Sequence, residues 1–260
     1  MLAYLNAHVL AIVFGLLGNI ISFLVFLAPI PTFYKIYRKK SSEGYQAIPY
    51  MVALFSAALL LYYAFLKTNA FMIITINAFG CFIELTYLAV YLLYAPTSSK
   101  ISTIKCILLF NIGGIGAVMV CSLLFVKDRQ TRVEVVGWIC AVINLAVFAA
   151  PLSIMRKVIR TKSVEYMPFG LSFFLTLCAT AWFFYGFFVN DFYIAVPNIA
   201  GFLLGIAQMI LYCVYKDSDK PLDKDRTRKP NKKSTDREDH EVEVIVCDNH
   251  PQQQQHQQHQ

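Results

Sequence analysis

Residues 26–50 read FLAPIPTFYKIYRKKSSEGYQAIPY, and residues 148–169 read FAAPLSIMRKVIRTKSVEYMPF. The two segments resemble each other, with Pro29 aligned on Pro151 at a separation of 122 positions. The similarity continues further along the chain, where LLYYAF pairs with WFFYGF and TINAFG pairs with VPNIAG. The chain therefore contains a long internal repeat, and a repeat of this length decides the fold.

The chain as a whole is too apolar for a soluble domain of its length. Of its 260 residues 57% are hydrophobic and 15% are charged. Seven stretches are nearly free of charge, and each has about the 20 residues that a helix needs to cross a bilayer. They lie near 8–30, 49–66, 71–94, 105–126, 134–155, 167–189 and 192–215. We therefore expect an all-α integral membrane protein with seven transmembrane helices.

The repeat covers the first three and the last three stretches, and the fourth stretch matches neither copy. A three-helix unit leaves the chain on the side opposite to its entry, so a second unit in the same orientation needs one more crossing. The sequence thus predicts two parallel three-helix bundles joined by a linker helix, a 3+1+3 arrangement. The expected parts are a first repeat at 1–97, the linker at 98–130, a second repeat at 131–215 and a disordered cytosolic tail at 216–260.

Basic residues are unevenly distributed between the two sets of loops. Ten lie in the loops after the first, third and fifth stretches: Lys35, Arg38, Lys39, Lys40, Lys100, Lys105, Arg156, Lys157, Arg160 and Lys162. Four lie in the opposite loops: Lys67, Lys127, Arg129 and Arg132. Because loops rich in Lys and Arg stay in the cytosol, we expect an extracellular N-terminus and a cytosolic C-terminus. The net charge of +7 is then a topology signal that leaves no basic face for a nucleic acid.

Four aligned prolines lie toward the expected cytosolic ends of helices: Pro29, Pro49, Pro151 and Pro168. Proline removes a backbone donor and bends a membrane helix. Any one of them alone is equally well explained as the end of a helix. Their recurrence in both copies favours paired hinges.

An asparagine recurs at equivalent positions, Asn77 and Asn198, each followed by glycine three residues later. A buried amide commonly donates or accepts a hydrogen bond to a neighbouring helix, and such a bond stabilises helix packing by roughly 1 kcal/mol. For a single asparagine this packing role would be the favoured explanation. Two asparagines related by the repeat are expected to face each other near the middle of the membrane. Amides both donate and accept hydrogen bonds, as sugar hydroxyls do, so the pair suits a polyol.

Trp182 lies about ten residues inside its stretch, which is too deep for the interfacial position that membrane tryptophans usually occupy. An aromatic face beside hydrogen-bonding groups suits the apolar C–H surface of a sugar. Trp182 is therefore a candidate binding residue together with the two asparagines.

Four residues near the expected extracellular helix ends are candidates for a gate: Tyr63, Tyr185, Lys67 and Asp191. A Lys67–Asp191 ion pair would latch this side when it is closed, whereas two unrelated solvated charges are the alternative. An exposed ion pair contributes roughly 0–1 kcal/mol, so we expect a weak latch.

Over residues 1–215 the chain resembles the plant SWEET family of sugar transporters, and within it the group that moves sucrose across the plasma membrane. The motifs that carry the resemblance are APIPTFYKIYRKKSSEGYQAIPY, TINAFGCFIE, AAPLSIMRKVIRTKSVEYMPF and PNIAGFLLGIAQMILYCVYK. The resemblance implies a carrier that binds sugar at the paired asparagines and bends at the four prolines. It also implies a homo-oligomer in the lipid bilayer of the plasma membrane, or alternatively the vacuolar membrane, with no cofactor.

The resemblance implies further positions that line the sugar path with small side chains: Ser22, Val25, Ser56, Asn144, Val147 and Cys178. Asn144 and Cys178 stand where serines are expected. Sucrose-type relatives usually carry a second tryptophan at the position of Leu60, so half of an aromatic clamp is missing here. Sucrose is the expected substrate, and a hexose such as glucose or fructose is the alternative.

Other classes of protein fit the sequence less well. A seven-helix receptor shares the topology but lacks a 3+1+3 repeat, and a related PQ-loop amino-acid exporter is expected to carry a carboxylate in its path. An enzyme would need a site such as HExxH, GxSxG or paired carboxylates, and the sequence has none of these. The only acid well inside a predicted helix is Glu84. We therefore expect a uniporter driven by the sugar gradient alone, since ion-coupled carriers place ionisable groups along the path.

Overall fold

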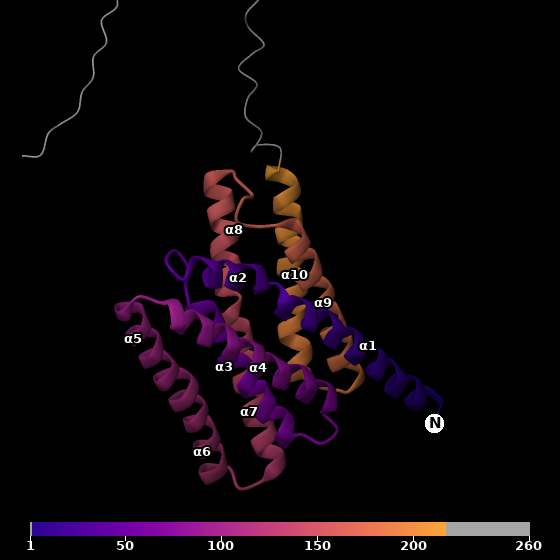
Figure 1. Cartoon of the computed structure of the whole chain (residues 1–260). Coiled ribbons are helices and arrows are strands. Elements are labelled where there is room, and N and C mark those ends of the chain that lie inside the picture. Colours follow the sequence, from indigo (N-terminus) through magenta and orange to yellow (C-terminus); the bar gives the residue numbers. More distant parts are fainter. Residues whose placement is uncertain (1, 217–260) are drawn as a thin grey trace, which may run out of the picture. The chain divides into compact units, whose positions relative to one another are not determined.

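The computed structural model describes residues 2–216, which form helices and short connections without a strand (Figure 1). The elements are α1 (Leu2–Leu27), α2 (Ile30–Lys39), α3 (Ile48–Leu66), α4 (Phe71–Tyr94), α5 (Thr97–Cys106), the π-helical segment η1 (Ile107–Gly114), α6 (Ile115–Phe125), α7 (Arg129–Val147), α8 (Ala149–Thr161), α9 (Phe169–Phe188) and α10 (Phe192–Tyr215). They make seven spans long and apolar enough to cross a membrane. Except for Lys216, the predicted tail lies outside the described residues.

Three spans are longer than the hydropathy of the sequence predicted. The first continues through α2 to Lys39, the linker span begins already at Thr97, and the fifth runs over Arg129–Thr161. The helix continues beyond the apolar stretch because its pattern becomes amphipathic: in α2, Phe33 and Ile36 are buried while Lys35, Arg38 and Lys39 are exposed. Hydropathy detects only the apolar part of a span, which lies in lipid. The amphipathic extension of the helix is detected by the periodicity of its apolar residues.

The third helix of each repeat lies between the other two. Within the first repeat α4 packs on both α1 and α3, and within the second α10 packs on both α7 and α9. Between the repeats α1 packs on α9, and α3 packs on α7. The linker helix of α5, η1 and α6 lies at one edge of the bundle, against α3 and α7 (Figure 1). This is the predicted arrangement of two three-helix bundles and a linker.

The four aligned prolines fall into two structural classes. Pro29 and Pro151 mark the breaks between α1 and α2 and between α7 and α8, where a missing N–H and a bulky ring interrupt the helix. Pro49 and Pro168 hold the same kind of position, in the first turn of α3 and at the N-cap of α9, but there a loop and not a helix precedes them. Proline is tolerated at a helix start, where its N–H would have no partner in any case. Only the first class divides a membrane span.

The loops define two ends of the bundle. We call the end where α2, α4, α8 and α10 finish the Lys40 end, and the end where α3, α6 and α9 finish the Asp191 end. Lys40 and Lys162 both follow their helices in the left-handed conformation, with φ of 52° and 56°. Their ammonium groups donate hydrogen bonds to the hydroxyls of Tyr94, at 3.2 Å, and Tyr215, at 2.8 Å. The same contact thus fastens α2 to α4 and α8 to α10.

Candidate functional site

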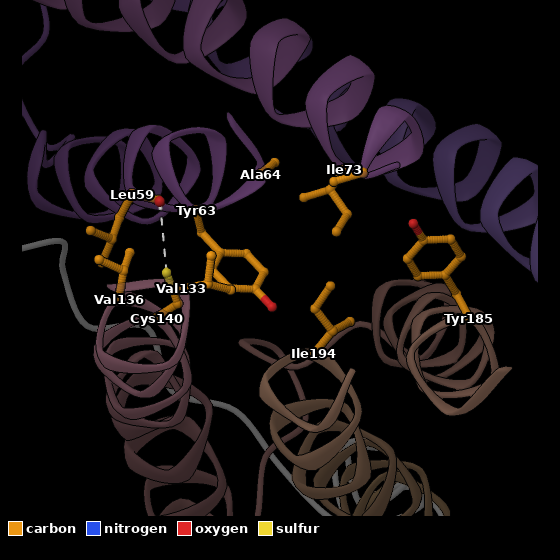
Figure 2. Packing of buried hydrophobic residues seen from close by; sticks show 10 residues of the cluster. Leu59, Tyr63, Ala64, Ile73, Val133, Val136, Cys140, Tyr185 and Ile194 are labelled. Atoms are coloured by element: carbon orange, nitrogen blue, oxygen red, sulfur yellow. Dashed lines mark hydrogen bonds between the residues drawn. The ribbon is translucent and has the colours of Figure 1, made fainter. Parts of the chain in front are cut away.

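Four buried side chains fill the interface between the repeats near the Asp191 end: Tyr63, Ile73, Tyr185 and Ile194. Figure 2 shows the two isoleucines pointing toward each other between the tyrosine rings. Tyr185 follows Tyr63 by 122 positions, and Ile194 follows Ile73 by 121 positions, which is the separation of the repeat. We call this group the closed layer.

Asp191 connects the closed layer to the loops above it. Its carboxylate oxygen Oδ2 accepts hydrogen bonds from the Tyr63 hydroxyl at 2.8 Å and from the Lys67 ammonium at 2.5 Å. Its other oxygen accepts from the backbone N–H of Ile194 at 3.3 Å. The Asp191 side chain is fully buried, and the Lys67 side chain is 25% exposed. The stabilisation of roughly 0–1 kcal/mol expected for an exposed ion pair therefore does not apply to this pair. Removing one partner would leave the other charge unpaired in a poorly solvated environment.

A central cavity of about 260 Å³ lies next to the closed layer, and residues of both repeats line it. Eight of the ten predicted binding residues are in its wall: Ser22, Leu60, Asn77, Asn144, Val147, Cys178, Trp182 and Asn198. Two are not: Val25 and Ser56. The isoleucines of the closed layer belong to the same wall, so the closed layer separates this cavity from the Asp191 end.

The paired asparagines make the same contact in both repeats. The amide nitrogen of Asn77 donates to the carbonyl of Ile73 at 2.9 Å, and that of Asn198 donates to the carbonyl of Ile194 at 2.7 Å. Both bonds stay within one helix, so among the described residues neither amide joins two helices. Each amide oxygen remains available to accept a hydrogen bond in the cavity.

Two hydrogen bonds cross between the repeats beside the asparagines. Ser22 Oγ of α1 and Cys178 Sγ of α9 are 3.1 Å apart, and the Ser56 hydroxyl of α3 donates to Asn144 Oδ1 of α7 at 2.9 Å. Asn144 is the repeat partner of Ser22, and Cys178 is that of Ser56. The two bonds are therefore equivalent under the repeat, and Ser56 reaches the cavity wall through Asn144.

Trp182 is held in place by α1. Its indole Nε1 donates to the Ser22 hydroxyl at 2.9 Å, and its ring lies edge-on to Tyr185, with centroids 5.3 Å apart. A β-carbon at Gly18 would lie only 2.9 Å from this ring, so the glycine provides the space for it. The opposite wall of the cavity holds Leu60, which has no comparable polar contact.

Sequence reasoning missed a pair of aromatic residues in the cavity wall, Phe26 and Phe148. They are 122 positions apart and open the two quoted repeat segments, so the repeat itself contained the signal. Phe26 packs on Gly80 and Phe148 on Gly201, where an added β-carbon would lie 2.7 Å and 3.1 Å from the ring. The glycine three residues after each asparagine thus makes room for this aromatic side chain.

Glu84 stays away from the cavity. It is 5% exposed, lies close enough to Tyr50 and Tyr87 to interact with them electrostatically, and has one carboxylate oxygen without a partner among the described residues. It does not line the central cavity. Its position inside the first repeat gives it no contact with a molecule in the central cavity.

Comparison with known proteins agrees with this geometry. The family model described as "Sugar efflux transporter for intercellular exchange" matches residues 12–99 and again residues 134–220. The chain is 62% identical over 245 residues to "Bidirectional sugar transporter NEC1" of Petunia hybrida, covering 94% of this chain and 91% of the relative. It is 61% identical over 217 residues to "Bidirectional sugar transporter SWEET9" of Arabidopsis thaliana, covering 84% of each. The solved structure of a eukaryotic SWEET transporter matches with a TM-score of 0.76 at 31% identity, over 82% of this chain and 99% of that chain.

Proposed function

This chain belongs to the SWEET family of sugar efflux transporters, and we propose that it carries sucrose across the plasma membrane as a bidirectional facilitative uniporter. It is a multi-pass membrane transporter and no enzyme, as the names of its relatives indicate. The observation that carries the proposal is the central cavity, where two amide oxygens and one indole ring come together at the interface of the repeats.

The cavity has the chemistry that a sugar needs. The oxygens of Asn77 and Asn198 accept hydrogen bonds from hydroxyl groups, and the Trp182 ring packs on the C–H face of the sugar. No charged residue is present in the cavity wall, which suits an uncharged substrate. Since the only buried glutamate of the spans, Glu84, lies elsewhere, the sugar gradient alone drives transport.

Alternating access follows from the two bundles. In the described conformation the closed layer and the Asp191 network shut one side of the central cavity. Rocking of one bundle against the other, with bending at Pro29 and Pro151, would open this side and shut the other. The distribution of basic loops supports an extracellular Asp191 end and a cytosolic Lys40 end. A homo-oligomer in the membrane is part of the same proposal.

A hexose is the second candidate substrate, and Leu60 is the observation that favours it. A disaccharide gains most from two aromatic walls, and this cavity has an indole on one side only. Three other predicted wall residues, Ser22, Val147 and Cys178, are small enough for either sugar.

Counterflow of labelled sucrose and labelled glucose in proteoliposomes, without an ion gradient, tests the proposal. We expect transient accumulation of labelled sucrose against unlabelled sucrose in the lumen, and weaker accumulation of glucose. Accumulation of glucose alone would replace sucrose by a hexose. Absence of counterflow for both sugars, with protein correctly inserted, would overturn the proposed function.

A further inference from the structure

A second cavity, of about 960 Å³, lies at the Asp191 end. Its floor contains Tyr63, Lys67 and Asp191, the residues that close the central cavity. Tyr193 is in the wall of both cavities, with its ring centroid 6.1 Å from that of Tyr63. We call the second cavity the vestibule. Only a thin layer of side chains separates it from the central cavity.

One face of α7 forms a wall of the vestibule. Gln130, Glu134 and Trp138 follow each other at intervals of four residues, so they project from the same side of the helix, and all three are exposed. The Gln130 amide donates to one carboxylate oxygen of Glu134 at 3.2 Å. Trp138 is 60% exposed, and its edge-to-face contact with Tyr193, at 5.5 Å between centroids, fixes the orientation of the indole. An oriented indole and a carboxylate therefore stand one turn apart.

The neighbouring charged groups show which of them is free for a ligand. Asp128 caps α7 by accepting from the backbone N–H and hydroxyl of Thr131, at 2.7 and 2.9 Å, and these bonds hold the pKa of Asp128 below its usual value. Arg129 Nε donates to the carbonyl of Leu66 at 3.2 Å, which fixes a guanidinium at the rim. Glu134 has one oxygen engaged by Gln130, so its second oxygen can accept from a ligand, and it is the carboxylate that shares a helix face with Trp138.

This combination differs from a membrane anchor. Interfacial tryptophans stand at the level of the lipid headgroups and need no partner. Here an exposed carboxylate lies on the same helix face as the indole, and a carboxylate in contact with hydrocarbon would be costly. The Glu134 end of this face must therefore be wet, and Glu134 and Trp138 line the same vestibule. An aromatic plane beside a carboxylate, an amide and a guanidinium is suited to a polyhydroxylated ligand, which presents hydroxyl donors and acceptors around apolar C–H surfaces.

We propose that the vestibule is an outer sugar-binding subsite, with Trp138 as its platform and Glu134 as its hydroxyl acceptor. The proposal rests on the sugar transport proposed above. The subsite holds a sugar against the closed layer on the Asp191 side, and opening of that layer lets the sugar pass Tyr193 into the central cavity. Sugar leaving in the other direction meets the same subsite after the central one.

The two tryptophans of the chain allow each cavity to be observed separately, because Trp138 lies in the vestibule and Trp182 in the central cavity. Full-length Trp182→Phe protein reports only on Trp138, and Trp138→Phe protein only on Trp182. Sucrose is titrated into each purified protein against glycerol at equal osmolarity while tryptophan fluorescence is recorded. Trp182→Tyr serves as the second variant if Trp182→Phe elutes as an aggregate.

We expect a saturable sucrose response from Trp138 that weakens at least tenfold in apparent affinity with Glu134→Gln. It should be unchanged by Glu43→Gln, an exposed glutamate at the Lys40 end, and by Asn77→Ala in the central cavity. A response from Trp182 without one from Trp138 would overturn the subsite and leave the proposed function intact. Loss of the Trp138 response upon Asn77→Ala would also overturn it, because the signal would then originate in the central cavity. Silence of both tryptophans would count against both proposals.

Discussion

The indole of Trp182 donates a hydrogen bond to the hydroxyl of Ser22 over 2.9 Å, which joins the second repeat to the first across the central cavity. The repeat places Leu60 where Trp182 stands in the other copy, and Asn144 where Ser22 stands. The cavity is therefore asymmetric in one respect. One side has an indole tied to a polar partner, and the other has a leucine beside an asparagine whose oxygen already accepts from Ser56.

Leu60→Trp should restore the second half of the clamp. An indole at this position would add a second stacking surface for the sugar. By the repeat, it would be placed relative to Asn144 as Trp182 is placed relative to Ser22. Aromatic contacts of this kind contribute about 1 kcal/mol, so we expect the KM for sucrose to fall about five-fold. The KM is measured from initial rates of sucrose uptake in proteoliposomes. Leu61→Trp, one position off the cavity wall, is the matched control, and an equal effect of both changes would show that Leu60 does not contact the sugar.

Asn77→Ala and Asn198→Ala should each reduce sucrose uptake at least tenfold, while surface delivery stays normal. Each removes a hydrogen-bond acceptor from the cavity, and a buried sugar hydroxyl left without its partner costs about 1–3 kcal/mol. Uptake normalised to biotinylated surface protein is the measurement. Asn111→Ala is a suitable control, because Asn111 is an equally buried asparagine outside the central cavity. Normal flux in both cavity variants would leave the asparagines with a packing role only.

The repeat made much of this arrangement predictable from the sequence. Equivalent spacing identified the two asparagines, because positions 121 apart must lie in equivalent places of two bundles, and Trp182 was identified by its depth inside an apolar stretch. Single-residue roles within the pairs were harder to predict. Pro49 and Pro29 look alike in the sequence, and only the positions of the helix boundaries show that Pro49 follows a loop whereas Pro29 divides a span.

Contacts between residues far apart in the chain were also not predictable from the sequence. The buried Asp191 carboxylate accepts from two side chains at the distant end of α3, Tyr63 and Lys67, and from the nearby N–H of Ile194, whereas charge alone suggested an exposed pair. Trp138 was not among the predicted site residues, because it lies near the start of its stretch, where a tryptophan is usual. Its cavity is built by loops and helix ends that periodicity does not describe.

Glu84→Gln should leave transport independent of pH. The carboxylate lies inside the first repeat and lines neither cavity, so its protonation has no direct route to the substrate. We expect wild-type and variant counterflow to be equal at pH 5.5, 6.5 and 7.5, to within about twofold, and a proton gradient to drive no net accumulation. Proton-driven accumulation in the wild type that disappears in Glu84→Gln would show an ion-coupled carrier instead.

The hinge prolines should separate into two pairs by their effect on turnover. Pro29→Ala and Pro151→Ala let α1 run into α2 and α7 into α8, so the spans lose the break about which their ends bend. Pro49→Ala and Pro168→Ala change only a helix start, where an N–H needs no partner within the helix. We expect kcat for counterflow to fall at least tenfold in the first pair and less than threefold in the second, with KM changed little. An equal loss of kcat in all four variants would show that the prolines do not act by dividing the membrane spans.

The Lys67–Asp191 pair should hold the closed layer shut more firmly than a surface ion pair does. Asp191 is fully buried and also accepts from Tyr63, so Asp191→Asn or Lys67→Met leaves an unmatched group behind. Opening is measured with Ile76→Cys, a buried position in the wall of the central cavity, by its rate of labelling with an impermeant maleimide added at the Asp191 end. Each variant should raise this rate about tenfold, equivalent to about 1.4 kcal/mol, and the double variant should raise it no further, because both changes break one interaction.

Asp128→Asn, an exposed acid at the same end, should leave the rate unchanged. Rates that rise less than twofold, or that multiply in the double variant, would identify Lys67 and Asp191 as independent charges.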